Sequence, residues 1–201
     1  KRLLFACEGR DHQSVVDFAA DLKAHAGDPA QIEHVCQDMS AAYAKGVALA
    51  LPNAQISYDR FHVIAMANEA MDGVRRQEMS TQPQAIKEAL GDNDRKLLKS
   101  LAWGMRRNPG DWSAKQTNAM HWLQRCTLKS ARAWRLKMAL RAVYASAAAG
   151  NDREHASKEL KGWLSWARRS RLEPFRKLAK TLSERFEAVV RGMLDSRSNA
   201  Y

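Results

Sequence analysis

QIEHVCQDMSAAYAKGVALALPNAQISYDRFH, residues 31–62, is the stretch that decides the expected fold. Its first part, Ile32–Cys36, is rich in residues that favour strands, and Ala54–Tyr58 alternates apolar and polar residues as a half-buried strand does. Between the two, Ser40 is placed to N-cap a helix, which Pro52 would end. The stretch is therefore predicted to fold as strand, helix and strand, with another helix beginning at its end.

Each predicted strand leads into an aspartate, Asp38 after the first and Asp59 after the second. Open α/β sheets bind ligands and metals at the carboxyl ends of their strands. We therefore take Asp38 as the first candidate for a catalytic or metal-binding residue. On these residues alone, a plain role in the turn or in capping the next helix is at least as good an interpretation.

The first sixty residues as a whole predict an α/β arrangement. Arg2–Cys7 is an apolar run typical of a buried strand, and apolar positions at helical spacing follow it between Val15 and Leu22. The resulting order is β-α-β-α-β, which implies parallel neighbouring strands. Three strands are too few for a complete sheet of this kind.

From residue 61 onward the pattern predicts helices and no strand. The breaks fall at turns that contain Gly, Pro or Asn. The predicted helices cover residues 61–79, 83–91, 94–107, 115–148, 153–169 and 174–194. All six tryptophans lie in this part, and we expect them to form the core of a helical domain.

The formal net charge of +11 is distributed unevenly along the chain. Residues 1–60 contain 6 Lys or Arg against 8 Asp or Glu, a balance of −2, and residues 61–201 contain the other 27 against 14, a balance of +13. A basic helical part beside a slightly acidic α/β part favours a nucleic acid as partner. The alternative is solvated surface charge that binds nothing, because basic helical proteins are common.

The cysteines and the apolar runs indicate the cellular compartment in which the protein is expected. Three cysteines without C-x-x-C spacing indicate neither a disulfide framework nor a zinc site, which fits a reducing cytoplasm. No apolar run approaches the roughly 20 residues of a membrane span, and no signal peptide is visible. We expect a cytoplasmic protein without a membrane partner. Because the sequence starts on Lys1 in strand-like sequence, we also expect a piece of a longer protein.

Eight short blocks of the sequence follow one another in a recognisable order. They are Asp38–Tyr43, Leu51–Ala54, Asp59–Val63, Arg75–Glu78, Trp103–Pro109, Trp163–Ala167, Ser170–Phe175 and Ser198–Asn199. In this order they resemble the DDE transposases of the ISL-three insertion-sequence family. Because the blocks match together over nearly the whole chain, the resemblance is far more specific than one short motif.

The resemblance implies a ribonuclease H-like catalytic domain. Residues 1–62 would form part of its core, residues 63–195 a helical insertion domain, and residues 196–201 the start of the final catalytic helix region. The expected fold class is therefore α/β plus all-α, with a partial ribonuclease H-like core (β-α-β-α-β) followed by a large helical insertion. The implied activity is cleavage and transfer of DNA strands during transposition.

The resemblance also implies a cofactor of two Mg²⁺ or Mn²⁺ ions. Such ions clamp an in-line phosphoryl displacement and prefer carboxylate ligands, of which DDE transposases use two aspartates and one glutamate. Asp38 matches the second aspartate. The first aspartate belongs to a strand that this chain lacks, and the glutamate lies a few residues beyond the pair matched by Ser198-Asn199. We therefore expect one of three metal ligands here, and no catalysis by this chain alone.

Asp59, Arg60 and His62 are the next candidates. In one interpretation Asp59 N-caps the helix that begins near Arg60, and His62 packs nearby. In the other, Asp59 and His62 form the rim of the metal site, where His62 contacts DNA phosphate or a water, and Arg60 binds phosphate. For Asp59 and His62 the sequence favours the two interpretations equally, whereas an arginine in the position of Arg60 is more often simply exposed.

Clusters of basic residues in the helical part are candidates for contacts to the DNA backbone. Such contacts need positive surface and carry no sequence information. Three of these residues share one helix face by their i, i+4, i+7 spacing: Arg125, Lys129 and Arg132. The full set of candidate cations there is Arg75, Arg76, Arg106, Arg107, Arg125, Lys129, Arg132, Arg168 and Arg169.

The leading hypothesis is thus a fragment of a transposase that acts on transposon ends and target DNA. A truncated sheet would expose strand edges, which favours a homo-oligomer. The alternative comes from a different class: a non-catalytic, basic helical module for nucleic-acid binding or assembly, in which Asp38 is only a structural cap.

Overall fold

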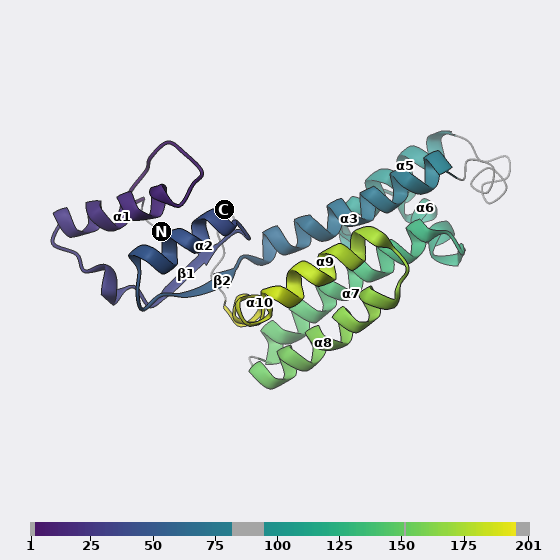
Figure 1. Cartoon of the computed structure of the whole chain (residues 1–201). Coiled ribbons are helices and arrows are strands. Elements are labelled where there is room, and N and C mark those ends of the chain that lie inside the picture. Colours follow the sequence, from purple (N-terminus) through teal and green to yellow (C-terminus); the bar gives the residue numbers. More distant parts are fainter. Residues whose placement is uncertain (1–2, 82–94, 151, 196–201) are drawn as a thin grey trace. The chain divides into compact units, whose positions relative to one another are not determined.

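The computed structural model describes residues 3–81, 95–150 and 152–195, and the chain divides into two compact units. The first unit comprises residues 1–63, 147–156 and 185–201, and the second comprises residues 64–146 and 157–184. Figure 1 shows the elements of both units in chain order. None of the helices described is long and apolar enough to cross a membrane.

The first unit is built on a parallel sheet of two strands, β1 (His34–Gln37) and β2 (Gln55–Tyr58). Parallel neighbours need a crossover connection, and α2 (Ala41–Ala50) provides it. The Ser40 side chain accepts a hydrogen bond from the backbone N–H of Tyr43 and so caps α2. The predicted strand, helix and strand, and the Ser40 cap, are confirmed.

Two helices and the strands enclose the core of this unit. α1 (Gln13–Ala24) packs against α2, and the short 3-10 helix η1 (Pro29–Gln31) leads into β1. The buried centre of the core is formed by Ala19, Val47 and Leu51, against which Val35 and Ile56 of the strands pack. α1 and α2 therefore cover the sheet face that carries Val35 and Ile56.

The helix α10 (Phe186–Leu194) packs directly onto β2. Gly192 of α10 lies so close to β2 that a Cβ atom built on it would be 2.0 Å from the carbonyl oxygen of Tyr58. Arg191 strengthens the contact by donating from Nε to the carbonyl of Ile56 at 2.8 Å. Only a glycine allows this approach of helix to strand.

The strand predicted over residues 2–7 is wrong for the part of it that is described. Residues 3–7 have no regular structure, and Leu3 and Leu4 are 84% and 74% exposed. An apolar run forms a strand only where a neighbouring strand accepts its backbone hydrogen bonds. No such neighbour pairs with the segment among the described residues, so the sheet has two strands where three were predicted.

The second unit is helical, as the sequence pattern predicts. The helices that build it, three of which continue into the first unit, are α3 (Arg60–Thr81), α5 (Arg95–Arg106), α6 (Ala114–Arg125), α7 (Lys129–Gly150), α8 (Arg153–Arg169) and α9 (Glu173–Glu184). A 3-10 helix, η2 (Pro109–Asp111), joins α5 to α6. The largest fully buried side chains of the second unit include Met71, Met105, Leu140, Tyr144 and Phe175. The helix predicted over residues 83–91 lies outside the described residues.

Two helices that we predicted as continuous are interrupted. The helix predicted over 115–148 is two helices, α6 and α7, separated by residues 126–128, and the one predicted over 174–194 is broken at Arg185 into α9 and α10. Neither break contains Gly or Pro. Local composition therefore gives no sign of the breaks, because packing decides where these helices change direction.

The expectation that all six tryptophans form the core is wrong for two of them. Trp163 is buried, and its indole N–H donates to the carbonyl of Leu136 at 2.9 Å. Trp103 and Trp166 are 49% and 43% exposed. On α8 the buried stripe passes through Leu160, Trp163 and Ala167, and Trp166 lies beside it.

Replacing Gly192 by Ala is expected to destabilise the first unit by about 3 kcal/mol. The new methyl group meets the backbone of β2, which cannot move aside as a flexible side chain would. The matched control is Gly162→Ala on α8, where no atom lies within 4 Å of the added Cβ. It should stabilise the chain by about 0.5–1 kcal/mol through helix propensity alone. Urea unfolding followed by circular dichroism measures both changes, and equal midpoints for the two variants would refute the tight contact.

Candidate functional site

The pairing of β1 with β2 brings two carboxylates to one edge of the sheet. Gln37 is the register partner of Tyr58, and each is the last residue of its strand. The next residue of each chain segment is an aspartate, and the backbone N–H of Asp59 donates to the carbonyl of Gln37 at 3.1 Å. Asp38 and Asp59 therefore leave the carboxyl ends of neighbouring parallel strands side by side.

Asp38 is half-buried, and one of its two carboxylate oxygens is engaged by the turn that follows. Its Oδ1 accepts a hydrogen bond from the backbone N–H of Ser40 at 2.9 Å. No described residue donates to Oδ2. The side chain thus shapes the entry to α2 through one of its two carboxylate oxygens.

Asp59 is 1% exposed and caps α3. Its Oδ1 accepts from the backbone N–H of Phe61 at 2.9 Å, which is the capping geometry that the sequence allowed. The rings of Phe61 and His62 meet edge to face at 5.7 Å between centroids. Arg60 and Phe61 are exposed, whereas His62 is half-buried. The site edge therefore carries a cation and an aromatic ring next to the two carboxylates.

The described residues fit a divalent metal only in part. Within them no three His, Cys, Asp or Glu side chains gather closely enough to hold an ion. Asp38 can supply one carboxylate oxygen of the type that Mg²⁺ prefers. The pair Ser198-Asn199 lies outside the described residues.

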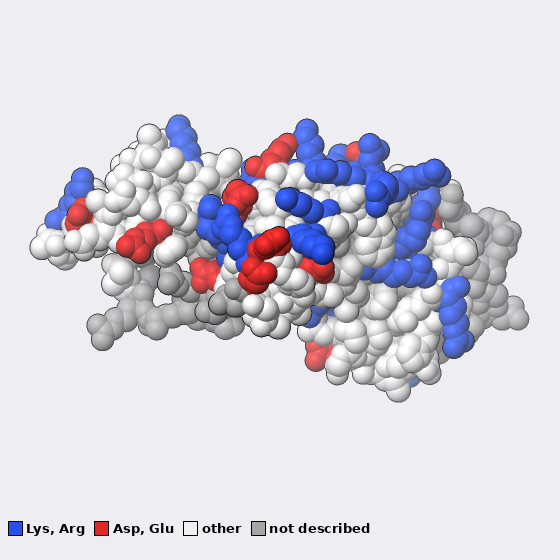
Figure 2. Space-filling model, turned by 90° about the horizontal axis from the view of Figure 1, so that it is seen from below, with Lys and Arg blue, Asp and Glu red and all other residues white. Residues whose placement is uncertain are grey.

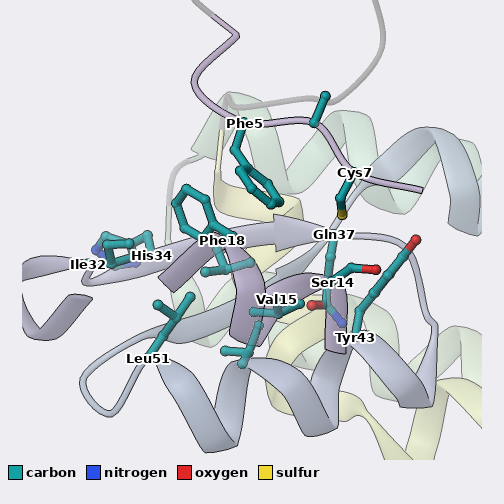
Figure 3. A pocket seen from close by; sticks show the side chains of 13 residues that line it. Phe5, Cys7, Ser14, Val15, Phe18, Ile32, His34, Gln37, Tyr43 and Leu51 are labelled. Atoms are coloured by element: carbon teal, nitrogen blue, oxygen red, sulfur yellow. The ribbon is translucent and has the colours of Figure 1, made fainter. Parts of the chain in front are cut away.

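A pocket of about 530 Å³ lies beside β1 on the α1 side (Figure 3). Its walls are mostly apolar and include Phe5, Phe18 and Val35. At its other end, Ser14 Oγ and Gln37 Oε1 are buried and find no hydrogen-bond partner among the described residues. Buried polar atoms usually have partners, so the sheet edge next to this pocket is incompletely covered.

Among the candidate DNA-binding cations, three surround Asp72 of α3. Arg75, Arg76 and Arg106 each place a guanidinium nitrogen within 3.3 Å of its carboxylate. Burial alone would raise the pKa of Asp72, but the hydrogen bonds and charges of Arg75 and Arg106 hold the pKa below its usual value. These cations are therefore committed first to an ion-pair cluster that links α3 to α5.

The single helix face predicted for Arg125, Lys129 and Arg132 is wrong. Arg125 is the last residue of α6, and the other two belong to α7, so the break between the helices separates them. Arg132 is exposed and donates to the carbonyl of Ser170 at 3.4 Å. Arg107 is exposed just after α5.

Arg168 and Arg169 are exposed in the last turn of α8. The guanidinium of Arg168 donates to the hydroxyl of Ser183 on α9. Figure 2 shows Lys and Arg side chains over much of the helical unit, whereas the part that carries the sheet shows few. On the face that Figure 2 shows, the predicted contrast in charge between the two parts of the chain is present.

Glu78 was part of a matching block, but its role could not be read from the sequence. It is 2% exposed, and its carboxylate accepts from the backbone N–H groups of Lys129 at 2.6 Å and Ser130 at 2.8 Å. The Ser130 hydroxyl also donates to it at 2.6 Å. A carboxylate 51 residues away thus caps the N-terminus of α7, where negative charge is favoured.

Lys137 plays the complementary role at a helix C-terminus. It is fully buried, and its Nζ donates to the carbonyls of Met105 at 2.6 Å and Arg106 at 3.2 Å, the last residues of α5. Burial lowers its pKa to about 8, and the positive charge of Arg141 adds to the decrease.

Comparison with known proteins identifies relatives over the whole chain. The model of a family described as transposase, of the DDE and ISL3 type, matches residues 1–201. Two curated relatives are transposases for insertion sequence element IS1557, from Mycobacterium tuberculosis strains CDC 1551 and H37Rv. Each is 29% identical over 94% of this chain, which spans 44% of the relative's length. No solved structure matches the chain significantly.

Replacing Glu78 by Ala is expected to lower the free energy of unfolding by about 3 kcal/mol, because two N–H groups at the start of α7, one of them buried, lose their acceptor. The control is Glu69→Ala on the same helix, where the side chain is exposed and the change should stay within about 0.5 kcal/mol. Chemical unfolding of both variants at neutral pH provides the comparison. A loss below about 1 kcal/mol for Glu78→Ala would contradict the capping role.

The lowered pKa of Lys137 predicts that stability increases with pH in the alkaline range. The unfolded chain binds this proton up to its ordinary pKa of 10.5, whereas the folded chain releases it at about 8. Between these values the unfolded state holds more protons, so deprotonation favours folding. Unfolding free energies of wild type and Lys137→Met at pH 8 to 10 should show the increase in the wild type relative to the variant. If the unfolding free energies of wild type and variant change in parallel with pH, the predicted contribution of Lys137 is ruled out.

Proposed function

This chain belongs to the transposase family of insertion sequences, and from that premise we propose that it forms part of a catalytic domain that cuts and transfers DNA strands. The observation that carries the proposal is the family match over residues 1–201. Asp38 supports it, because it directly follows the parallel strand β1. Transposon ends and target DNA are the proposed substrates.

The sheet is proposed to be part of a ribonuclease H-like core. Its parallel strands, the crossover helix between them and the carboxylates after both strands support this assignment. The pocket beside β1, where Ser14 Oγ and Gln37 Oε1 lack partners among the described residues, supports the proposal that further strands of such a core pack there. The same open edge makes self-association a further proposal.

We keep the predicted division of the chain as part of this proposal. Residues 1–62 would be the partial core, 63–195 the helical insertion, and 196–201 the start of the final catalytic helix region. The chain spans less than half the length of its curated relatives, which supports a complete enzyme that draws catalytic residues from beyond these 201. On this view the 201 residues alone are inactive.

Asp38 is proposed to act as a metal ligand through its carboxylate. When bound, Mg²⁺ or Mn²⁺ would supply activation of the attacking oxygen and stabilisation of the leaving oxygen in phosphoryl transfer. The hydrogen bond from Ser40 orients the Asp38 side chain and leaves Oδ2 available. A ligand fixed by its own turn needs little reorganisation when an ion binds.

Asp59, Arg60 and His62 are proposed to shape the edge of this site. Asp59 fixes the first turn of α3, so that Arg60 is held exposed beside the strand ends. From there its guanidinium can bind a DNA phosphate, and the half-buried His62 can contact the same backbone.

The alternative function is a non-catalytic, basic helical module that binds nucleic acid. The turn in which Asp38 serves as an acceptor favours it. The catalytic function needs the negative charge of Asp38, whereas the alternative function needs only its shape and its ability to accept the hydrogen bond from Ser40.

Asp38→Asn separates the two functions, because an amide oxygen can still accept the Ser40 hydrogen bond whereas the negative charge is lost. In the complete transposase that contains this chain, we expect cleavage of labelled transposon-end DNA in Mg²⁺ to fall by about a thousandfold or more. DNA binding and folding should be unchanged. The control is Asp17→Asn, an exposed aspartate of α1, which should cleave as the wild type does.

Cleavage by Asp38→Asn at the wild-type rate would refute the catalytic proposal. Activity of the isolated 201-residue chain would instead refute the proposal that further acidic ligands are needed.

A further inference from the structure

The hairpin of α8 and α9 in the helical unit contains a basic groove that the function proposed above does not use. The groove has a volume of about 440 Å³, and its cations are Arg168, Arg176, Lys177 and Lys180. The other lining residues are Glu173, Ser183 and Glu184. Four positive charges against two negative ones leave the groove with a net charge of +2.

The amphipathic pattern of α9 fixes which side chains face the groove. Its buried stripe consists of Phe175, Leu178, Ala179 and Leu182. The three cations of α9 lie off this stripe, and all are exposed. Arg176 and Lys180 are four residues apart, about one helical turn or 6 Å along the axis, so they form a row of charge along the helix.

Arg168 lines the groove from α8 and is bonded to α9. Its guanidinium donates to the Ser183 hydroxyl, which itself donates to the carbonyl of Ala179 at 2.7 Å. This chain of hydrogen bonds ties the end of α8 to the last turns of α9. One cation of the groove is thus kept in place by the fold.

The carboxylates of the groove pair with its cations in exposed ion pairs. Glu173 pairs with Arg176 at 3.2 Å and Glu184 with Lys180 at 3.9 Å, and all four side chains are more than half exposed. Exposed ion pairs of this kind contribute little and are screened by salt. Lys177, between the two pairs, makes no ion pair with any described residue. A competing anion can therefore take over these cations without breaking a buried interaction.

We propose that this groove binds the sugar-phosphate backbone of duplex DNA. The inference rests on the proposed function and adds to it a specific surface outside the strand-end site. A row of exposed cations along one helix suits a ligand with regularly repeated phosphates, because each cation needs only one phosphate oxygen nearby. A single small anion would need several donors that converge on one point. Backbone contacts of this kind position the DNA and do not select its sequence.

Binding of a fluorescent 30-base-pair duplex of random sequence to the 201-residue chain tests the groove. The variant Arg176→Gln/Lys177→Gln/Lys180→Gln removes its row of charge, and the control Lys99→Gln/Lys115→Gln/Lys158→Gln removes three exposed cations of the helical unit outside the groove. We expect the groove variant to bind at least about tenfold more weakly at 0.1 M salt. The slope of log K against log salt should decrease by about 0.9 for each phosphate that the variant no longer neutralises.

A second variant tests the groove in the opposite direction. Glu173→Gln/Glu184→Gln frees Arg176 and Lys180 from their partners and should tighten DNA binding. Equal losses for the groove variant and the control would overturn the proposal, because total charge alone would then explain binding. Unchanged or weaker binding by the Glu variant would also overturn it.

The same groove variant in the complete transposase distinguishes failure of this inference from failure of the proposed function. If the groove variant binds and cleaves as the wild type while Asp38→Asn does not cleave, the groove inference is wrong and the catalytic proposal stands. If Asp38→Asn cleaves normally while the groove variant loses DNA binding, the groove inference stands and the catalytic proposal is wrong.

Discussion

The parallel pairing of β1 with β2 is the constraint on which the candidate site depends. Because the strands run in the same direction and in register, the residues that follow them emerge at one edge, and both are aspartates. The contact of Gly192 with the Tyr58 backbone clamps α10 onto the same strand. Loss of the strand pairing would separate Asp38 from Asp59 without changing a residue of the site.

In the helical unit, two carboxylates and one buried ammonium among the described residues join neighbouring helices. Glu78 caps α7, Lys137 caps α5, and Asp72 gathers three arginines between α3 and α5. These contacts sort the many cations of the unit into two kinds. Some stabilise the helical fold, and others, such as Lys177, face solvent and are available to a polyanion. Net charge alone could not make this distinction.

Local patterns predicted much of the fold and part of the site. The Ser40 cap, the strands on either side of α2 and most helices follow from residues within a few positions of one another. The strand at residues 2–7 failed because a strand needs a partner that its own sequence cannot supply. The breaks at residues 126–128 and Arg185 were missed because no Gly or Pro marks them. Family resemblance, and not the spacing of residues, singled out Asp38 above an ordinary turn aspartate.

The sequence by itself determined the family, the basic character of the helical part and the positions of the two strand-end aspartates. Each of these depends on residue identity and short-range periodicity. Only the tertiary structure decided that Asp59 is buried while Arg60 is exposed, that Glu78 caps a helix 51 residues away, and that Arg168 and the cations of α9 share one groove. These features join residues distant in sequence, and packing brings such residues together according to shape and burial, which no local pattern records.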